Sequence, residues 1–163
     1  MTSMDPDLPP PSDGRQSQAA LDIARGTRRL LLAHGFASLP ELSLANGRRA
    51  DLIALSERGD VWIIEIKSSI EDFRADSKWP QYREFCDQLY FAVNPQFPLA
   101  LLPADSGHIV ADRFGAELIQ AAPLHPLAAA RRKALVNRMA RVGALRLTAL
   151  ADPELQLERS WNG

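Results

Sequence analysis

Three charged residues interrupt two neighbouring apolar segments of the chain. Asp51 lies in the segment 49–55, and Glu65 and Lys67 lie at the end of the segment 61–67, which is otherwise made of Val, Trp and Ile. A charge inside a strand that is buried on both faces is costly unless it is paired or binds a cation. Two carboxylates and a lysine are also the residue types that hold a divalent cation and assist hydrolysis of a phosphodiester.

The turn between the two segments decides whether the carboxylates meet. Side chains in a strand alternate between faces, so Glu65 and Lys67 share a face. A three-residue loop over 57–59 fits the glycine at its end, because Gly59 can take the left-handed conformation of a bulged turn. In that register Asp51 lies directly opposite Glu65, with Cβ atoms about 4.5–5.5 Å apart. Carboxylates this close repel each other, so the sequence predicts a cation between them.

Magnesium suits this pair, because it takes hard oxygen ligands, commonly one or two carboxylates with waters and phosphate oxygens. The backbone carbonyl of Ile66 is a further candidate ligand. Lys67, beside the metal, would position or deprotonate the attacking water and help to neutralise the transition state. The alternative is a structural ion pair of Lys67 with Asp51 or Glu65 in a domain without activity.

The bulk composition fits one globular domain. The 163 residues are 46% hydrophobic and 24% charged, with a formal net charge of −1, and a domain usually has roughly 100–200 residues. The single cysteine, Cys86, excludes an internal disulfide framework and a cysteine-based zinc cluster. No apolar run reaches the roughly 18 residues of a membrane span and the start lacks the features of a secretion signal, so we expect a cytoplasmic protein.

The predicted helices and strands follow the order of an α/β domain. Apolar spacing indicates a helix over 17–34, ended by Gly35, and a last long helix over 127–147. Strands are expected at 41–44, 50–55, 61–67, 88–93 and 108–111. We expect three regions: a disordered, proline-rich tail over 1–15, a domain over 16–150 and a C-terminal tail over 151–163.

The motif of Asp51 followed by Glu65-Ile66-Lys67 resembles the signature of the PD-(D/E)XK nuclease superfamily, with Ala50 where the signature has proline. The resemblance implies a three-layer α/β sandwich, with a central mixed β-sheet flanked by helices, and a Mg²⁺ or Mn²⁺ site. The helix over 17–34 lacks the glutamate that many members carry there. Glu41, on the first expected strand, is a candidate substitute, and the number of metals is left open.

A longer resemblance covers nearly all of the chain after the first 15 residues. It implies a role in the bacterial DNA damage response, with DNA as the partner and other repair proteins as further candidates. The segments similar to the MmcB-like DNA repair family are 48–52, 65–68, 72–73, 76–80, 90–93 and 109–117.

Residues that follow the motif are candidates for DNA binding. Lys78 could contact a phosphate, and Trp79 and Tyr82 could stack on an unpaired base, which reads no particular sequence. The two aromatic residues could equally cover the sheet. Asp76 is expected to pair with Arg74 or Lys78 on a solvated face rather than to bind a metal.

The last helix carries a second set of candidates. Its basic residues fall on one side and its apolar residues on the other. The basic side is either a solvated face or a track for phosphates. The candidates on it are Arg131, Arg138 and Arg141.

Two functions from different classes fit these residues. The first is a metal-dependent deoxyribonuclease that acts in DNA repair. The second is a catalytically silent nuclease-fold module that binds damaged, branched or single-stranded DNA and recruits repair enzymes. A restriction-type enzyme is a third possibility, for which no second domain is evident. The DNA structure recognised, the cleavage polarity and the oligomeric state are left open.

Overall fold

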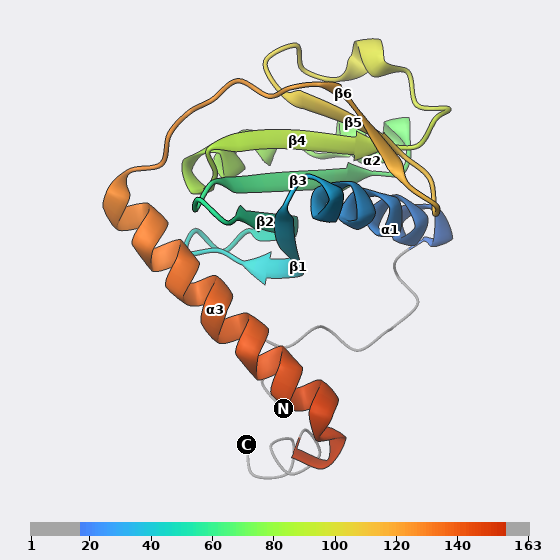
Figure 1. The fold of residues 1–163 in the computed structure, drawn as a ribbon. Helices are drawn as coiled ribbons and strands as arrows, with labels where there is room; N and C mark the ends of the chain where they lie inside the picture. The colour runs from blue at the N-terminus through green and yellow to red at the C-terminus, as the bar shows by residue number, and fades with distance from the viewer. Residues whose placement is uncertain (1–16, 156–163) are drawn as a thin grey trace.

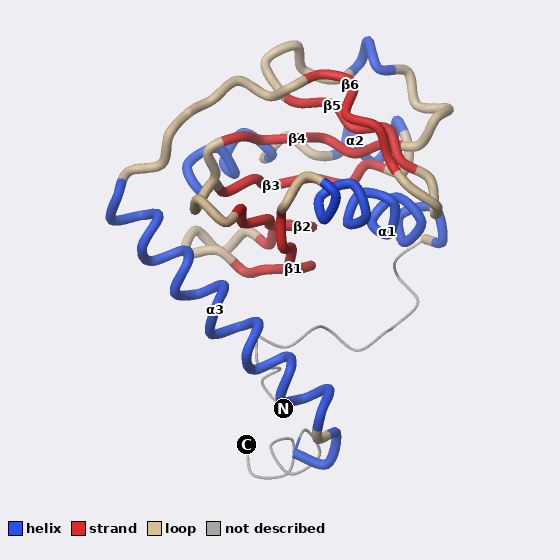
Figure 2. Tube along the Cα trace, viewed as in Figure 1, coloured by secondary structure: helices blue, strands red, loops and turns tan. Residues whose placement is uncertain are grey.

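The computed structural model describes residues 17–155. The predicted tail over 1–15 and residues 156–163 of the predicted C-terminal tail lie outside them. Figure 1 colours the elements in chain order, and Figure 2 colours them by secondary structure. They are α1 (Gln18–Ala33), β1 (Phe36–Ser43), β2 (Arg49–Ser56), β3 (Val61–Lys67), α2 (Ile70–Ala75), η1 (Trp79–Phe85), β4 (Gln88–Val93), η2 (Leu99–Leu101), β5 (Gly107–Ala111), β6 (Ala116–Gln120) and α3 (Ala129–Ala151).

The strands form one mixed sheet in the order β1-β2-β3-β4-β5-β6. Strands β3, β4 and β5 run parallel, while β1, β2 and β6 pair antiparallel with their neighbours. The predicted α/β fold with a mixed sheet flanked by helices is confirmed. The expected strand at 41–44 is the end of the longer β1, and β6 was not predicted. Within residues 17–155 no helix is long and apolar enough to cross a membrane.

The two faces of the sheet are covered by different helices. On one face Ile53 and Ile63 pack in a core with Leu135 and Met139 of α3. On the other face, the neighbouring residues Leu52 and Ile64 of the same strands pack with residues of α1. This alternation places α1 over one face, as Figure 1 shows, and brings residues of α3 into the core on the other.

Helix α1 is fixed at both ends and along its middle. It begins after Ser17, whose hydroxyl accepts a hydrogen bond from the Ala20 N–H at 3.1 Å. It ends before Gly35, which has the left-handed φ of +80° that the sequence predicted. In between, Gly26 packs on the β5–β6 turn so closely that a Cβ there would lie 1.9 Å from the carbonyl oxygen of Asp112.

Asp87 is a buried carboxylate that ties the sheet to α3. It accepts hydrogen bonds from the N–H groups of Val61 and Leu127 at 2.8 and 2.9 Å. The guanidinium of Arg132 donates to both of its oxygens at 2.7 Å. Burial alone would raise the pKa of Asp87, but the hydrogen bonds from Arg132 and the two amides hold it below its ordinary value.

We expect Asp87→Asn to lower the free energy of unfolding by about 1–3 kcal/mol, because the buried carboxylate accepts hydrogen bonds from Arg132 and two backbone amides that a neutral amide group satisfies less well. Urea unfolding measures this change. The matched control is Asp105→Asn, since the Asp105 side chain is 65% exposed in its ion pair with Arg83, and exposed pairs contribute about 0–1 kcal/mol. Equal losses in the two variants would contradict this account of Asp87.

Candidate active site

The β2–β3 turn sets the register that brings the acidic residues together. Gly59 has a φ of +91°, and the Ser56 N–H donates to the carbonyl oxygen of Asp60 at 3.0 Å. The two strands pair with Leu52 opposite Ile64 and Leu55 opposite Val61. One further step in this register places residue 51 opposite residue 65, as the sequence predicted.

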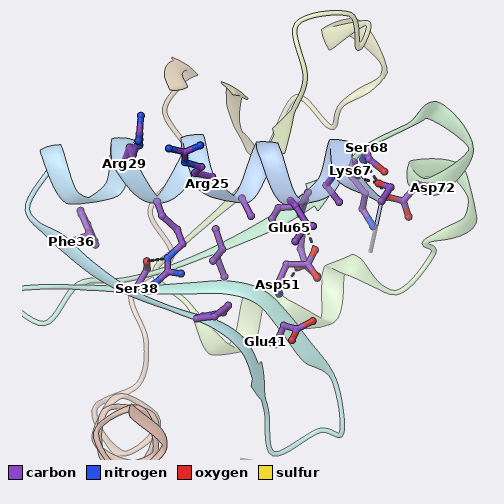
Figure 3. A pocket seen from close by; sticks show the side chains of 18 of the residues that line it. Arg25, Arg29, Phe36, Ser38, Glu41, Asp51, Glu65, Lys67, Ser68 and Asp72 are labelled. Atoms are coloured by element: carbon purple, nitrogen blue, oxygen red, sulfur yellow. Dashed lines mark hydrogen bonds between the residues drawn. The ribbon is translucent and has the colours of Figure 1, made fainter. Parts of the chain in front are cut away.

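Asp51 and Glu65 each bond to the strand that carries the other. The Ile66 N–H donates to Asp51 Oδ2 at 2.8 Å, and the Asp51 N–H donates to Glu65 Oε2 at 3.0 Å. Only 3% of Glu65 is exposed. The carboxylates therefore satisfy backbone donors at the point where the β2–β3 ladder ends (Figure 3).

The electrostatics of this pair fit a bound cation. Burial raises the pKa of Asp51, and burial together with the negative charge of Asp51 raises the pKa of Glu65 well above its ordinary value. Two adjacent carboxylates in this setting retain a proton or take up a positive ion. Their oxygens are the hard donors that Mg²⁺ and Mn²⁺ prefer, so the residues present fit such an ion.

Lys67 has a different partner from the one that the sequence suggested. Its Nζ donates to Asp76 Oδ2 at 2.7 Å, and its side chain is only 7% exposed. Asp76 also accepts the Lys78 N–H at 3.0 Å. The expectation that Asp76 pairs with Arg74 or Lys78 on a solvated face was wrong. The error arose because the path of the loop after α2, which brings Asp76 back to β3, leaves no periodic signal in the sequence.

Tyr82 belongs to the core and to the acidic pair rather than to an exposed stacking surface. Its ring is buried in the α3-side core, and its hydroxyl donates to the Arg49 carbonyl oxygen at 2.9 Å. Burial and the negative charge of Glu65 raise the pKa of Tyr82. The buried ring argues against the predicted stacking on a base and places the hydroxyl beside the carboxylates.

The neighbours of Tyr82 divide between core and surface. Trp79 is partly buried, and its ring centroid lies 5.3 Å from that of Phe91. The Arg83 guanidinium lies 5.3 Å from the centroid of the Trp79 ring. This geometry fits the alternative in which Trp79 covers the sheet. Lys78 is exposed, and its predicted contact with phosphate stays a prediction.

Glu41 lies beside the acidic pair without joining it. The β1–β2 pairing, with Pro40 opposite Leu52, places Glu41 level with Asp51. Its φ of +52° is unusual for a residue with a side chain, and its carboxylate lies 3.9 Å from the Arg49 guanidinium. Within the described residues no group of three or more His, Cys, Asp or Glu side chains could hold a metal ion, so Glu41 adds no third carboxylate in this conformation.

Several basic residues of α3 attach the helix to the domain. The Arg131 guanidinium lies 4.5 Å from the Phe85 ring centroid, and Arg138 donates to the Ser43 carbonyl oxygen at 2.6 Å. Arg146 donates to the carbonyl oxygen of Glu41 at 2.8 Å. Arg141 is exposed. Packing therefore engages two of the three arginines that the sequence offered as a phosphate track.

A groove of about 1150 Å³ links the acidic pair to α1. Asp51, Glu65 and Lys67 line it together with parts of α1 and β1 (Figure 3). Three arginines of α1 that were not predicted to be functional, Arg25, Arg28 and Arg29, line it as well. The sequence feature that could have identified these arginines is that they cluster on the polar side of the predicted first helix.

Comparison with known proteins gives two matches. A family model described as DNA repair protein MmcB-like matches residues 7–154. Among solved structures, the SPO1766 protein of unknown function from Silicibacter pomeroyi is 47% identical, with a TM-score of 0.82. That match covers 85% of this chain and 95% of that chain. No curated protein matches the chain.

We expect the wild-type protein, measured without divalent cations, to lose stability relative to Glu65→Gln as the pH rises. A raised pKa means that folded Glu65 keeps a proton that the unfolded chain releases above about pH 4.3. The stability present below that pH is therefore lost as the pH climbs toward the folded pKa, by up to about 1.4 kcal/mol per pH unit. Urea unfolding at a series of pH values measures this loss. Glu84→Gln, at an exposed position, is the control, and a pH-independent difference between wild type and Glu65→Gln would refute the burial argument.

Proposed function

This chain belongs to the MmcB-like family of DNA repair proteins, and we propose that it hydrolyses DNA phosphodiesters with the help of a divalent cation. The observation that carries the proposal is the adjacent pair of Asp51, which is half-buried, and Glu65, which is buried, at the edge of an open groove. Two adjacent carboxylates withdrawn from water repel each other unless a proton or a cation lies between them. Their position beside Lys67 supplies the charges that phosphodiester hydrolysis needs.

We further propose that the fold is that of the PD-(D/E)XK nuclease superfamily. Support comes from the order of a helix, three antiparallel strands and a parallel fourth strand. It also comes from the placement of Asp51 on β2 and of Glu65 and Lys67 on β3. The DNA repair description of the family fits such an activity.

Each residue of the site would have a distinct role. Asp51, Glu65 and the Ile66 carbonyl would hold Mg²⁺ or Mn²⁺, which when bound activates a water and stabilises charge on the phosphate. Lys67 contributes hydrogen-bond donors and positive charge at the same end of the groove. Asp76 fixes the position of Lys67 through the 2.7 Å contact.

A second candidate is a module that binds DNA without cutting it and recruits repair enzymes. The observation that favours it is the direction of Lys67, which donates to Asp76 rather than to Asp51 or Glu65. Within residues 17–155 no group of three or more acidic, histidine or cysteine side chains could hold a metal ion, which points the same way. Such a site could keep its cation and its DNA contacts after losing catalysis.

We expect the wild-type protein to cut DNA in Mg²⁺ or Mn²⁺ but not in chelator. We expect Lys67→Ala to cut DNA at least about 100-fold more slowly, because this variant lacks a positive charge at the reacting phosphate. The assay uses labelled single-stranded, duplex, nicked and branched DNA. Lys133→Ala makes the same change at an exposed position on α3 and should cut like the wild type. DNA binding without product in any metal would replace the nuclease with the recruitment module.

Metal binding can be tested without any reaction. At a cation concentration of about 100 times Kd, binding adds about 2.7 kcal/mol, which raises Tm by roughly 5–10 °C for a chain of this length. We expect Mg²⁺ or Mn²⁺ to give this rise in the wild type and not in Asp51→Asn/Glu65→Gln, measured by differential scanning calorimetry. Glu84→Gln should respond like the wild type, and an equal rise in the double variant would place the ion elsewhere.

A further inference from the structure

The groove that ends at the acidic pair carries arginines along its other part. Arg25, Arg28 and Arg29 of α1 all line it, and all three are exposed. In Figure 3, Arg25 and Arg29 follow one another along α1, away from Asp51 and Glu65. The groove therefore has one end rich in carboxylates and one end rich in guanidinium groups.

The positive charge of these arginines is not neutralised by the described part of the chain. Arg28 Nε donates to the Ser38 hydroxyl at 3.3 Å, and Arg29 Nη1 donates to the Phe114 carbonyl oxygen at 2.8 Å. Both acceptors are uncharged. Within residues 17–155 none of the three forms an ion pair, and the Arg25 side chain has no hydrogen-bond partner there.

We propose that the phosphates of a DNA strand lie along Arg25, Arg28 and Arg29, so that the strand continues to the acidic pair. This inference rests on the proposed function and adds the route by which the strand reaches the site. Positions 25 and 29 are about 6 Å apart along the helix axis, so the guanidinium groups can follow a polymer of regularly spaced charges. Arginine is also well suited to phosphate, because its planar fork can donate two hydrogen bonds.

The side chains of the groove indicate contact with the backbone of the strand rather than with its bases. The aromatic residues that line it, Phe36 and Tyr82, are only 8% exposed, so they offer no platform for base stacking. Contacts to phosphate carry no sequence information and weaken steeply with salt. Binding along α1 should therefore be tolerant of sequence and sensitive to ionic strength.

The length of the groove fits an extended polymer. It has about 1150 Å³ and is lined both by the acidic pair and by Arg25, Arg28 and Arg29 of α1. The arginines of α3 belong to a separate surface, because α3 and α1 pack on opposite faces of the sheet. Substitutions on α1 therefore test the route along α1 alone.

The experiment measures binding of a fluorescein-labelled single-stranded oligonucleotide by anisotropy, in chelator so that no strand is cut, over a range of salt concentrations. The test variant is Arg25→Ala/Arg28→Ala, and Arg25→Lys/Arg28→Lys keeps the charge. The matched control is Arg58→Ala/Arg74→Ala, which removes two exposed charges from the β2–β3 turn and from α2, at positions that do not line the groove. Thermal unfolding of each variant checks that the fold is intact.

We expect the alanine variant of α1 to bind at least about tenfold more weakly at low salt, with a salt slope smaller by about 1.4, since each lost phosphate contact removes about 0.7. The lysine variant should keep most of the slope, and the control should bind like the wild type. An α1 variant that binds like the wild type, or a control that loses as much, would overturn the route along α1 while leaving the proposed function intact. A wild-type protein that binds no DNA at low salt would instead overturn the proposed function itself.

Discussion

The candidate site depends on one exchange of hydrogen bonds between β2 and β3. Asp51 accepts the Ile66 N–H, and Glu65 accepts the Asp51 N–H, so each carboxylate is held by a backbone donor where the β2–β3 ladder ends. The exchange occurs only in the register set by Gly59. A slip of one residue would send one carboxylate to the opposite face of the sheet and separate the pair. The chemistry of the site therefore depends directly on the length of a turn.

Local signals in the sequence predicted this part of the molecule well. Gly59 indicated the turn, alternation indicated the faces, and Gly35 marked the end of the first helix. These features depend on neighbours along the chain or across one hairpin, where the allowed geometries are few. For the same reason the mixed sheet with helices on both faces could be predicted from the order of its elements.

Partners that meet through the tertiary fold were predicted poorly. Asp76 reaches Lys67 because the loop after α2 returns to the sheet, and Tyr82 points its hydroxyl at the acidic pair because its ring packs beneath α3. The arginines of α1 share a groove with Asp51 only because the helix crosses the sheet beside β1. Their chemistry was visible in the sequence, whereas their direction follows from packing over long distances in the chain.

The position of α1 is itself decided by a residue that carries no functional group. Gly26 faces the β5–β6 turn, and any Cβ at this position would collide with backbone oxygens of Asp112 and Gly115. Backbone atoms in a tight turn cannot move aside as the end of a flexible side chain can. A larger residue would thus push the whole helix outward and carry the rim of the groove with it. The width of the groove is in this sense fixed by backbone contacts between α1 and the β5–β6 turn.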